Sequence, residues 1–335
     1  MITSRVFDPA YPEIMEYTLE SDALIVKVIN LGATITSIIC KKDNCDVVLG
    51  YDKAADYLRF ENYFGATIGR CANRIHHASF RLHDTIYHLA ENDHGNSLHG
   101  GTLGFHGRIF TAEIIEDGIM LSYESPDMEE GYPGKLKFSV TYQLCEHDLH
   151  IHYHAVSDAD TIVNFTNHTY FALQGQGKGS VDHQLLNMNA DRYACNDAQR
   201  MVNGDIIDVK GTPFDFQKEK EIGTDIRKKE DLQIVYANGY DHYFLFAKDQ
   251  EHVVSVKDTT TQHSLLVKTD LPGFHFYVPD YDVPQQGKQH ALYQRHCGFC
   301  IETSFLPDAI NLQEEAETLL KAKEQFHSTT TFTIH

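Results

Sequence analysis

Basic residues are scarce in this chain of 335 residues. Lysine and arginine together number 28, against 48 aspartates and glutamates, which gives a formal charge of −20 at pH 7. A negative charge of this size repels nucleic acid and anionic membrane surfaces, and it disfavours highly anionic substrates. We therefore expect neither a nucleic-acid partner nor a membrane partner.

Long apolar runs are also missing. The N-terminus, M-I-T-S-R-V-F-D-P, contains no hydrophobic segment of signal-peptide length, and no stretch is long enough to span a membrane. The seven cysteines are scattered and odd in number, which argues against a disulfide framework and fits a reducing compartment. These features predict a cytoplasmic protein.

Linkers, repeats and helical patterns are equally sparse. No stretch rich in proline, serine and glycine divides the chain, and no repeat of fixed period is present. We therefore expect a single domain over residues 1–335. Only two short segments, 54–59 and 224–229, show a helical pattern.

The chain instead alternates apolar and polar residues from end to end. In the segment 149–155, apolar residues alternate with His150, His152 and His154, and similar stretches recur between turns of Gly, Asn, Asp and Pro. Hydrophobic residues make up 42% of the chain, enough for a sizeable core. The pattern predicts an all-β fold with two packed antiparallel sheets, a β-sandwich with few short helices.

Two clusters raise the question of a metal site. Alternate histidines in 150–154 would lie about 6–7 Å apart on one strand face, close enough for imidazoles to converge. With 21 histidines in an acidic chain, however, such clusters arise by chance, and we favour a solvated strand face. The CxxC at 297–300 lacks a well-spaced second pair, since Cys40 and Cys45 are distant in sequence and loosely spaced. We expect no metal.

The most informative segment is N-F-T-N-H-T-Y-F at 164–171. If it forms a strand, Asn164, Thr166, His168 and Tyr170 point to one face. That face is a row of hydrogen-bonding groups around a titratable imidazole, a surface suited to hydroxyl groups. A solvated sheet face would also carry polar residues, so this segment alone leaves both interpretations open.

Other segments place polar side chains at turns. Asn73 and Arg74 follow a glycine turn, and the donor fork of arginine suits vicinal hydroxyls or a ring oxygen. His99 lies beside paired glycines, which allow backbone to approach a ligand closely. An ordinary surface arginine and a plain turn are the alternatives.

Two carboxylates complete the candidate set. Asp241 precedes an aromatic pair in G-Y-D-H-Y-F. Glu302 lies in the apolar run G-F-C-I-E-T-S-F, where Phe299 and Ile301 would face a core and Glu302 the opposite side. A glutamate in so apolar a run is typical of a cleft with perturbed pKa values.

Taken together, these segments make the chain resemble the aldose 1-epimerases, also called galactose mutarotases, from about Asp46 to Asn311. Each motif alone is a weak signal, but their shared order is a strong one. The seven motifs are F-G-A-T-I-G-R-C-A-N-R-I, N-S-L-H-G-G, N-F-T-N-H-T-Y-F, P-F-D-F, G-Y-D-H, P-G-F-H-F-Y, and G-F-C-I-E-T with P-D-A-I-N.

The resemblance implies a large twisted β-sandwich that binds sugar in an open cleft. It implies an isomerase that interconverts the α and β anomers of an aldohexose such as galactose or glucose, without metal or organic cofactor. By motif position, Glu302 matches the family's general base and His168 its general acid. Further positions match residues that bind the sugar or share the acid's face: Asn73, Arg74, His99, Tyr170, Asp241 and His275.

The chain departs from the family pattern at several positions. His275 and Ser304 replace glutamines, Tyr243 replaces an asparagine, and Leu306 stands where tryptophan is frequent, in a chain that has no tryptophan. None of these is the proposed acid or base, but they leave the preferred sugar open. An epimerase for maltose or a related sugar is the nearest alternative, with His275 as the position to examine.

Other functions fit less well. A hexose 6-phosphate epimerase would gather basic residues around the phosphate, and a glycoside hydrolase would need two carboxylates flanking the bond. A sugar-binding protein without catalysis would tolerate loss of the glutamate or histidine, and both are present. Monomer and homodimer both remain open.

The implied mechanism needs an ionised Glu302 and a protonated His168. Reference pKa values near 4.3 and 6.5 leave the carboxylate charged at neutral pH but the imidazole only partly so. A neighbouring carboxylate favours the imidazolium form. We therefore hypothesise that Asp241 or Glu302 helps to keep His168 protonated.

Overall fold

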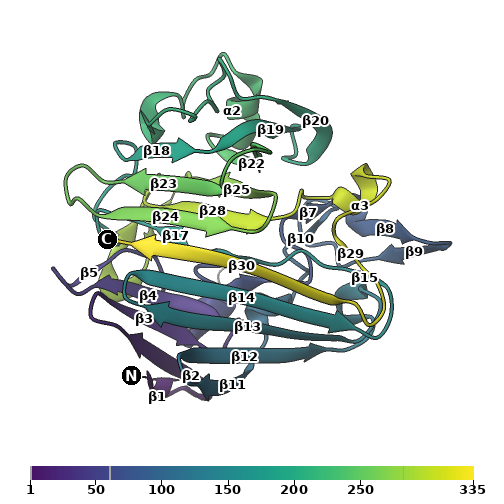
Figure 1. Cartoon of the computed structure of the whole chain (residues 1–335), viewed down its shortest axis with the longest axis horizontal. Helices are drawn as coiled ribbons and strands as arrows, with labels where there is room; N and C mark the ends of the chain where they lie inside the picture. The colour runs from purple at the N-terminus through teal and green to yellow at the C-terminus, as the bar shows by residue number, and fades with distance from the viewer. Residues whose placement is uncertain (1, 60–61, 282) are drawn as a thin grey trace.

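The computed structural model describes residues 2–59, 62–281 and 283–335. Its body consists of three antiparallel sheets with nine, five and six strands, and Figure 1 shows the nine-stranded sheet crossing the molecule. The nine strands, in spatial order, are β11 (Thr111–Ile115), β12 (Gly118–Ser125), β13 (Leu136–Cys145), β14 (Asp148–Ser157), β30 (Gln325–Ile334), β24 (Ser264–Thr269), β23 (Val253–Lys257), β18 (Leu185–Met188) and β21 (Lys220–Glu221).

The other two sheets are smaller. The five-stranded sheet runs in chain order through β1 (Ile2–Asp8), β2 (Tyr11–Glu20), β3 (Leu24–Ile29), β4 (Thr34–Cys40) and β5 (Cys45–Asp46). The six-stranded sheet has the order β17 (Tyr170–Phe171), β28 (Phe299–Ser304), β25 (Gly273–Tyr277), β22 (Asp241–Phe246), β19 (Ala190–Asn196) and β20 (Val202–Asp208).

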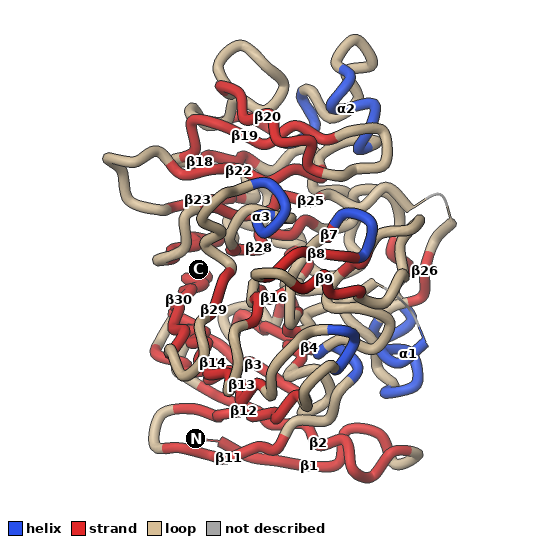
Figure 2. The backbone as a smooth tube through the Cα atoms, turned by 90° about the vertical axis from the view of Figure 1, so that its right-hand side faces the viewer, coloured by secondary structure: helices blue, strands red, loops and turns tan. Residues whose placement is uncertain are grey.

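Short strand pairs and helices complete the fold, and the helices lie at its periphery (Figure 2). The pairs are β6 (Thr67–Ile68) with β16 (Thr166–Asn167), β7 (Arg74–Ile75) with β10 (Ser97–Leu98), β8 (Ser79–Leu82) with β9 (Thr85–His88), β15 (Thr161–Ile162) with β29 (Leu319–Leu320), and β26 (Gln285–Gln286) with β27 (Leu292–Tyr293). The helices are α1 (Ala54–Arg59), α2 (Leu232–Ala237) and α3 (Ala309–Leu312), with 3₁₀ turns at His76–Ala78, Phe105–Gly107, Glu129–Gly131, Ile222–Thr224 and Lys288–His290.

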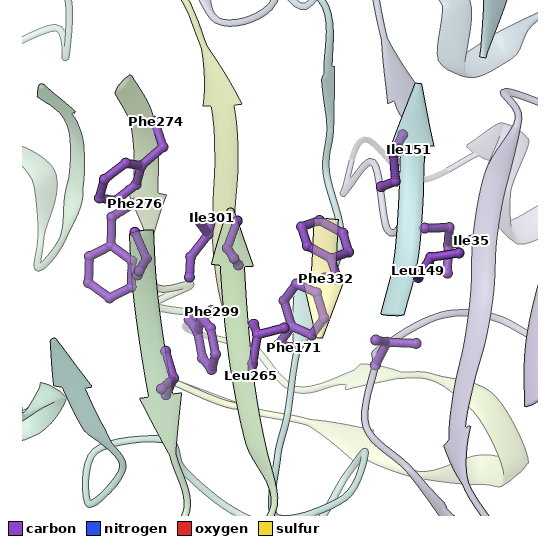
Figure 3. Packing of buried hydrophobic residues seen from close by; sticks show 14 of the residues in the cluster. Ile35, Leu149, Ile151, Phe171, Leu265, Phe274, Phe276, Phe299, Ile301 and Phe332 are labelled. Carbon is purple, nitrogen blue, oxygen red and sulfur yellow. The ribbon is translucent and has the colours of Figure 1, made fainter. Parts of the chain in front are cut away.

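One large core joins the three sheets into a β-sandwich. It takes side chains from β3 and β4, from β12 to β14, and from β25, β28 and β30. Figure 3 shows part of this core, in which the Phe171 and Phe332 rings meet edge to face at 5.1 Å. Burying aromatic and aliphatic side chains between sheets is what holds such layers together. The predicted all-β sandwich is confirmed.

The alternation that predicted strands is confirmed in detail. In β14 Leu149, Ile151, Tyr153 and Ala155 are buried, whereas His150, His152 and His154 are half-buried on the other face. The predicted helix at 54–59 is α1. No helix in the described ranges is both long enough and apolar enough to cross a membrane.

The second predicted helix, at 224–229, is wrong. A 3₁₀ turn at Ile222–Thr224 is followed by non-helical turns, and α2 begins only after Asp231. The Asp231 carboxylate accepts hydrogen bonds from the backbone N–H groups of Gln233 and Ile234, a regular N-cap. The helix therefore starts where its first N–H groups find an acceptor, eight residues later than predicted.

The segment 164–171 is not one continuous strand, contrary to our expectation. It forms β16 and β17, separated by two residues. The break comes from Asn167, whose side-chain oxygen accepts the backbone N–H of Thr169, a local bond that competes with strand pairing. The side chains of Thr166 and Asn164 are both buried. The Asn164 amide donates to the Phe305 carbonyl and accepts the Phe305 backbone N–H.

Candidate active site

All eight residues singled out in the sequence line one cavity of about 200 Å³. They come from four strands of the six-stranded sheet, from the two residues between β16 and β17, from β7, and from the loops next to β7 and β10. The cavity also touches four residues that the sequence did not indicate. Its lining consists of Tyr63, Asn73, Arg74, Leu98, His99, His168, Tyr170, Arg200, Asp241, His275, Tyr277 and Glu302.

The six-stranded sheet positions the carboxylates. Glu302 on β28 lies directly opposite His275 on β25, and Asp241 on β22 is opposite Tyr277 on β25. Because side chains alternate along a strand, these four share one sheet face. Their neighbours Phe274, Phe276, Phe299 and Ile301 face the core (Figure 3), which confirms the orientation expected for β28.

Four of the lining residues lie on loops with unusual backbone angles. Tyr63, Asn73, His99 and Arg200 all have positive φ, between 52° and 62°. Such conformations are uncommon for residues with a side chain, and they gather at functional sites. Gly100 follows His99 at φ 86°, where a Cβ would lie 1.9 Å from the Gly69 carbonyl oxygen. That glycine therefore serves backbone-to-backbone packing rather than the approach to a ligand.

His168 and Glu302 form the buried end of the cavity. The Nε2 atom of His168 lies 3.6 Å from Oε1 of Glu302, and both side chains are almost fully buried. The imidazole stacks on Tyr170 with ring centres 5.0 Å apart, and His99 meets it edge-on at 5.2 Å. On its other side, Nδ1 lies 3.5 Å from the Cys300 sulfur. These contacts hold the imidazole in a fixed orientation.

Burial controls the protonation of this pair. It lowers the pKa of His168 to about 3, although the charge of Asp241 acts in the opposite direction. Burial also raises the pKa of Glu302 well above its ordinary value, helped by the charge of Asp241. Both effects reflect the cost of moving a charged form out of water. The charge of Asp241 therefore acts on His168 in the direction that we hypothesised, but burial outweighs it.

Asp241 behaves differently from Glu302. Burial alone would raise its pKa, but the hydrogen bond and charge of His275, followed by the charges of Arg74 and Arg200, bring it well below the usual range. The His275 Nε2 atom donates to Oδ1 of Asp241 at 2.6 Å, and its Nδ1 lies 3.2 Å from the Asn73 amide nitrogen. Asp241 is thus the permanent negative charge of the cavity.

A metal ion fits this donor set poorly. His99, His168 and Glu302 offer ligand atoms within 4.8 Å of one another, the only such trio in the described part of the chain. However, Nδ1 of His99 accepts the backbone N–H of Asn73 at 3.2 Å, so the proton of the neutral ring lies on Nε2. A metal needs that nitrogen unprotonated. His99 instead presents an N–H donor to the cavity.

The two clusters raised by the sequence form no ligand set of three among the residues described. His150 and His152 each bond through Nδ1 to a threonine of β30, at 2.9 and 3.0 Å. Both cysteines of the CxxC at 297–300 are buried thiols, and burial raises the pKa of Cys297 to about 12. A thiol with so high a pKa is a poor metal ligand and a poor nucleophile.

The sequence missed Tyr63, Leu98, Arg200 and Tyr277. Tyr277 follows His275 by two residues on one strand, so alternation could have indicated it. Tyr63 and Arg200 come from loops without a recognisable pattern. Of the departures from the family motifs, only His275 lines the cavity, because Tyr243 is buried with its hydroxyl donating to the Ser304 carbonyl at 3.0 Å.

Larger cavities lie elsewhere, and in one of them the buried lysine already has partners. The one beside the five-stranded sheet, about 280 Å³, is lined by Lys288. The Lys288 ammonium donates to the Thr36 carbonyl at 2.6 Å and to Asp46 at 2.7 Å. Such a group stabilises the fold and has little left to offer a ligand.

Comparison with known proteins agrees with the geometry. The family model described as aldose 1-epimerase matches residues 15–333. The chain is 38% identical to the galactose mutarotase of Homo sapiens over 325 residues, covering 95% of this chain and 93% of that protein. It is 34% identical to the aldose 1-epimerase of Haemophilus influenzae over 305 residues, covering 89% and 88% respectively.

Solved structures share the same fold. The galactose 1-epimerase from Lactobacillus acidophilus superposes with a TM-score of 0.87 at 29% identity, covering 100% of this chain and 98% of that one. An aldose epimerase homologue from C. elegans gives a TM-score of 0.86 at 24% identity, covering 94% and 96%.

Proposed function

The chain belongs to the aldose 1-epimerase family and is an isomerase that interconverts the α and β anomers of aldoses, and from this premise we propose that Glu302 and His168 transfer the protons. The observation that carries the proposal is their separation of 3.6 Å at the buried end of the cavity. The C1 hydroxyl and the ring oxygen share one carbon, so the two proton-transfer groups must stand close together.

Ring opening needs one proton transfer to Glu302 and one from His168. Ionised Glu302 takes the proton of the C1 hydroxyl while the His168 imidazolium protonates the ring oxygen, and the C1–O5 bond breaks. Rotation about C1–C2 turns the aldehyde over. Protonated Glu302 then returns its proton to the C1 oxygen as neutral His168 takes the proton from O5, and the ring closes as the other anomer.

The effect of burial on the pKa values of this pair bears on the cycle. The pair holds one proton in total at every stage, because His168 gives its proton to O5 while Glu302 takes the proton of the C1 hydroxyl. Burial favours the neutral pair, which is the state paired with the open aldehyde. Ring opening therefore converts the pair into the form that burial favours, and the negative charge of Asp241, which raises the pKa of His168, supports the imidazolium needed at the start.

The remaining cavity residues are proposed to hold the sugar. Arg74 is oriented by Asp93, which accepts from its Nε at 2.6 Å and leaves the terminal nitrogens for hydroxyls. His99 donates from Nε2, and Asp241 accepts. His275 has both ring nitrogens bonded within the protein, to Asn73 and Asp241. We therefore assign it to positioning these two residues rather than to direct sugar contact.

We propose an aldohexose, with galactose first, as the preferred sugar, since relatives at 38–39% identity are named galactose mutarotases. We also propose that the chain is a single domain, that it acts in the cytoplasm as a monomer or homodimer, and that no nucleic acid takes part. Seven free cysteines support a reducing compartment, and the charge of −20 opposes binding to nucleic acid.

A polarimetric time course tests the chemistry. Freshly dissolved α-D-galactose, α-D-glucose and maltose would be followed with the wild type, with Glu302→Gln and with Glu324→Gln, which changes an exposed glutamate. Loss of a general base lowers the rate about 10²–10⁴-fold, so Glu302→Gln should be nearly inactive and Glu324→Gln fully active. A loss of less than tenfold in Glu302→Gln would refute its role.

A further inference from the structure

We propose that Arg200 is a further substrate-binding residue, which contacts the sugar hydroxyls on the ring edge opposite the C1–O5 bond. The inference rests on the proposed function of the cavity and extends it to specificity. Arg200 lies on the loop between β19 and β20 and lines the same cavity as His168 and Glu302.

The depth of the cavity determines which part of the sugar Arg200 can reach. The side chains of Glu302 and His168 are only 4% and 6% exposed, whereas that of Arg200 is 47% exposed. The reacting C1 and ring oxygen must lie at the buried end, against the proton-transfer pair. The opposite edge of a six-membered ring, which carries the hydroxyls on C3 and C4, then faces the open side where Arg200 lies.

The guanidinium of Arg200 has donors to spare. In the ranges that the structure describes, its side chain makes no hydrogen bond, and its one ion-pair partner is Oδ2 of Asp241 at 3.8 Å. That distance is too long for a direct hydrogen bond, but an oxygen placed between the two groups can reach both. Oδ1 of Asp241 is already bonded to His275. A sugar hydroxyl can therefore accept from Arg200 and donate to Oδ2 of Asp241.

The loop holds Arg200 in place before the sugar arrives. The Asp197 carboxylate accepts the backbone N–H groups of Gln199 and Met201, at 2.8 and 3.0 Å, and its carbonyl accepts the N–H of Arg200 at 3.0 Å. Arg200 has φ 62°, the left-handed conformation that it shares with Asn73, His99 and Tyr63 around the cavity. A turn fixed in this way lowers the cost of ordering the side chain on binding.

The structural alternative is a surface arginine with a weak ion pair. Pairs of this kind contribute little, and their loss would leave binding unchanged. Arg192 supplies a matched control, because it is 38% exposed and ion-pairs with Asp191 at 3.4 Å, yet it does not line the cavity.

Binding is measured first, with sugars that cannot react. Isothermal titration with 1,5-anhydro-D-galactitol and 1,5-anhydro-D-glucitol would compare the wild type, Arg200→Gln, Arg200→Lys and Arg192→Gln. Arg200→Gln removes a hydrogen bond from a charged donor, so it should weaken binding about tenfold or more. Lysine should restore part of the loss, since it keeps the charge but not the fork. Equal affinity in Arg200→Gln and Arg192→Gln would overturn the proposal.

Kinetics with deoxy sugars then locate the contact. In Arg200→Gln, KM for D-galactose should rise about tenfold, with kcat changed less than threefold. The same rise is expected for 6-deoxy-D-galactose. For 3-deoxy or 4-deoxy galactose the substitution should raise KM less, because the sugar hydroxyl that Arg200 would contact is already absent. An equal rise with all these sugars would overturn the assignment to the C3–C4 edge. If Arg200-dependent binding occurs without mutarotation by the wild type, the proposed chemistry fails and the role of Arg200 stands.

Discussion

Replacing His168 by glutamine tests the central electrostatic conclusion, that burial keeps this imidazole neutral. Its pKa is about 3 in the folded chain against a reference of 6.5. The unfolded chain therefore binds a proton at His168 as the pH falls below about 6.5, while the folded chain does not until about pH 3. A group with a depressed folded-state pKa contributes stability that is complete above 6.5 and is lost through this window.

The size of the effect follows from these two values. One pH unit within the window corresponds to about 1.4 kcal/mol, so the wild type should lose about 2 kcal/mol between pH 8 and pH 5 through His168 alone. His168→Gln has no such group. The stability difference between variant and wild type should therefore shift by about 2 kcal/mol in favour of the variant at pH 5.

Urea unfolding of both proteins at pH 8 and pH 5 measures this shift. The other buried histidines, such as His106 and His242, titrate in both proteins and cancel in the difference. His94→Gln, which replaces an exposed imidazole, controls for the loss of one histidine. A shift below about 0.5 kcal/mol would mean that burial does not control His168. A shift of opposite sign would mean that a carboxylate holds it as imidazolium, as the sequence had suggested.

Two further substitutions test buried polar groups outside the cavity lining. Lys288→Met leaves the Asp46 carboxylate without its partner at 2.7 Å and should lower the free energy of unfolding in urea by about 3 kcal/mol. Adding Asp46→Asn should recover part of that loss. Additive effects of the two substitutions would argue against the pairing. Tyr142→Phe removes a buried hydroxyl that donates to the Ala33 carbonyl at 2.6 Å. It should lower the free energy of unfolding by about 1–2 kcal/mol without changing KM. An unchanged midpoint in urea unfolding would contradict the importance of this bond.

The sequence was informative wherever a short range of residues carries the signal. Alternation along β14 and β28 predicted which side chains enter the core, because the side-chain period of a strand is two whatever surrounds it. The helix at 224–229 and the continuous strand at 164–171 were wrong for a common reason. Single side chains, those of Asp231 and Asn167, satisfy backbone N–H groups locally and move the element boundaries.

The sequence by itself determined the fold class, the family and eight residues that gather in one cavity, since motifs and periodicity are written along the chain. Only the tertiary structure decided the protonation of His168 and Glu302, because the pKa of a buried group depends on everything that replaces water around it. It also decided that Tyr63 and Arg200 belong to the cavity. Their loops carry no periodic pattern, and only the packed sheets bring them beside Asp241 and His99.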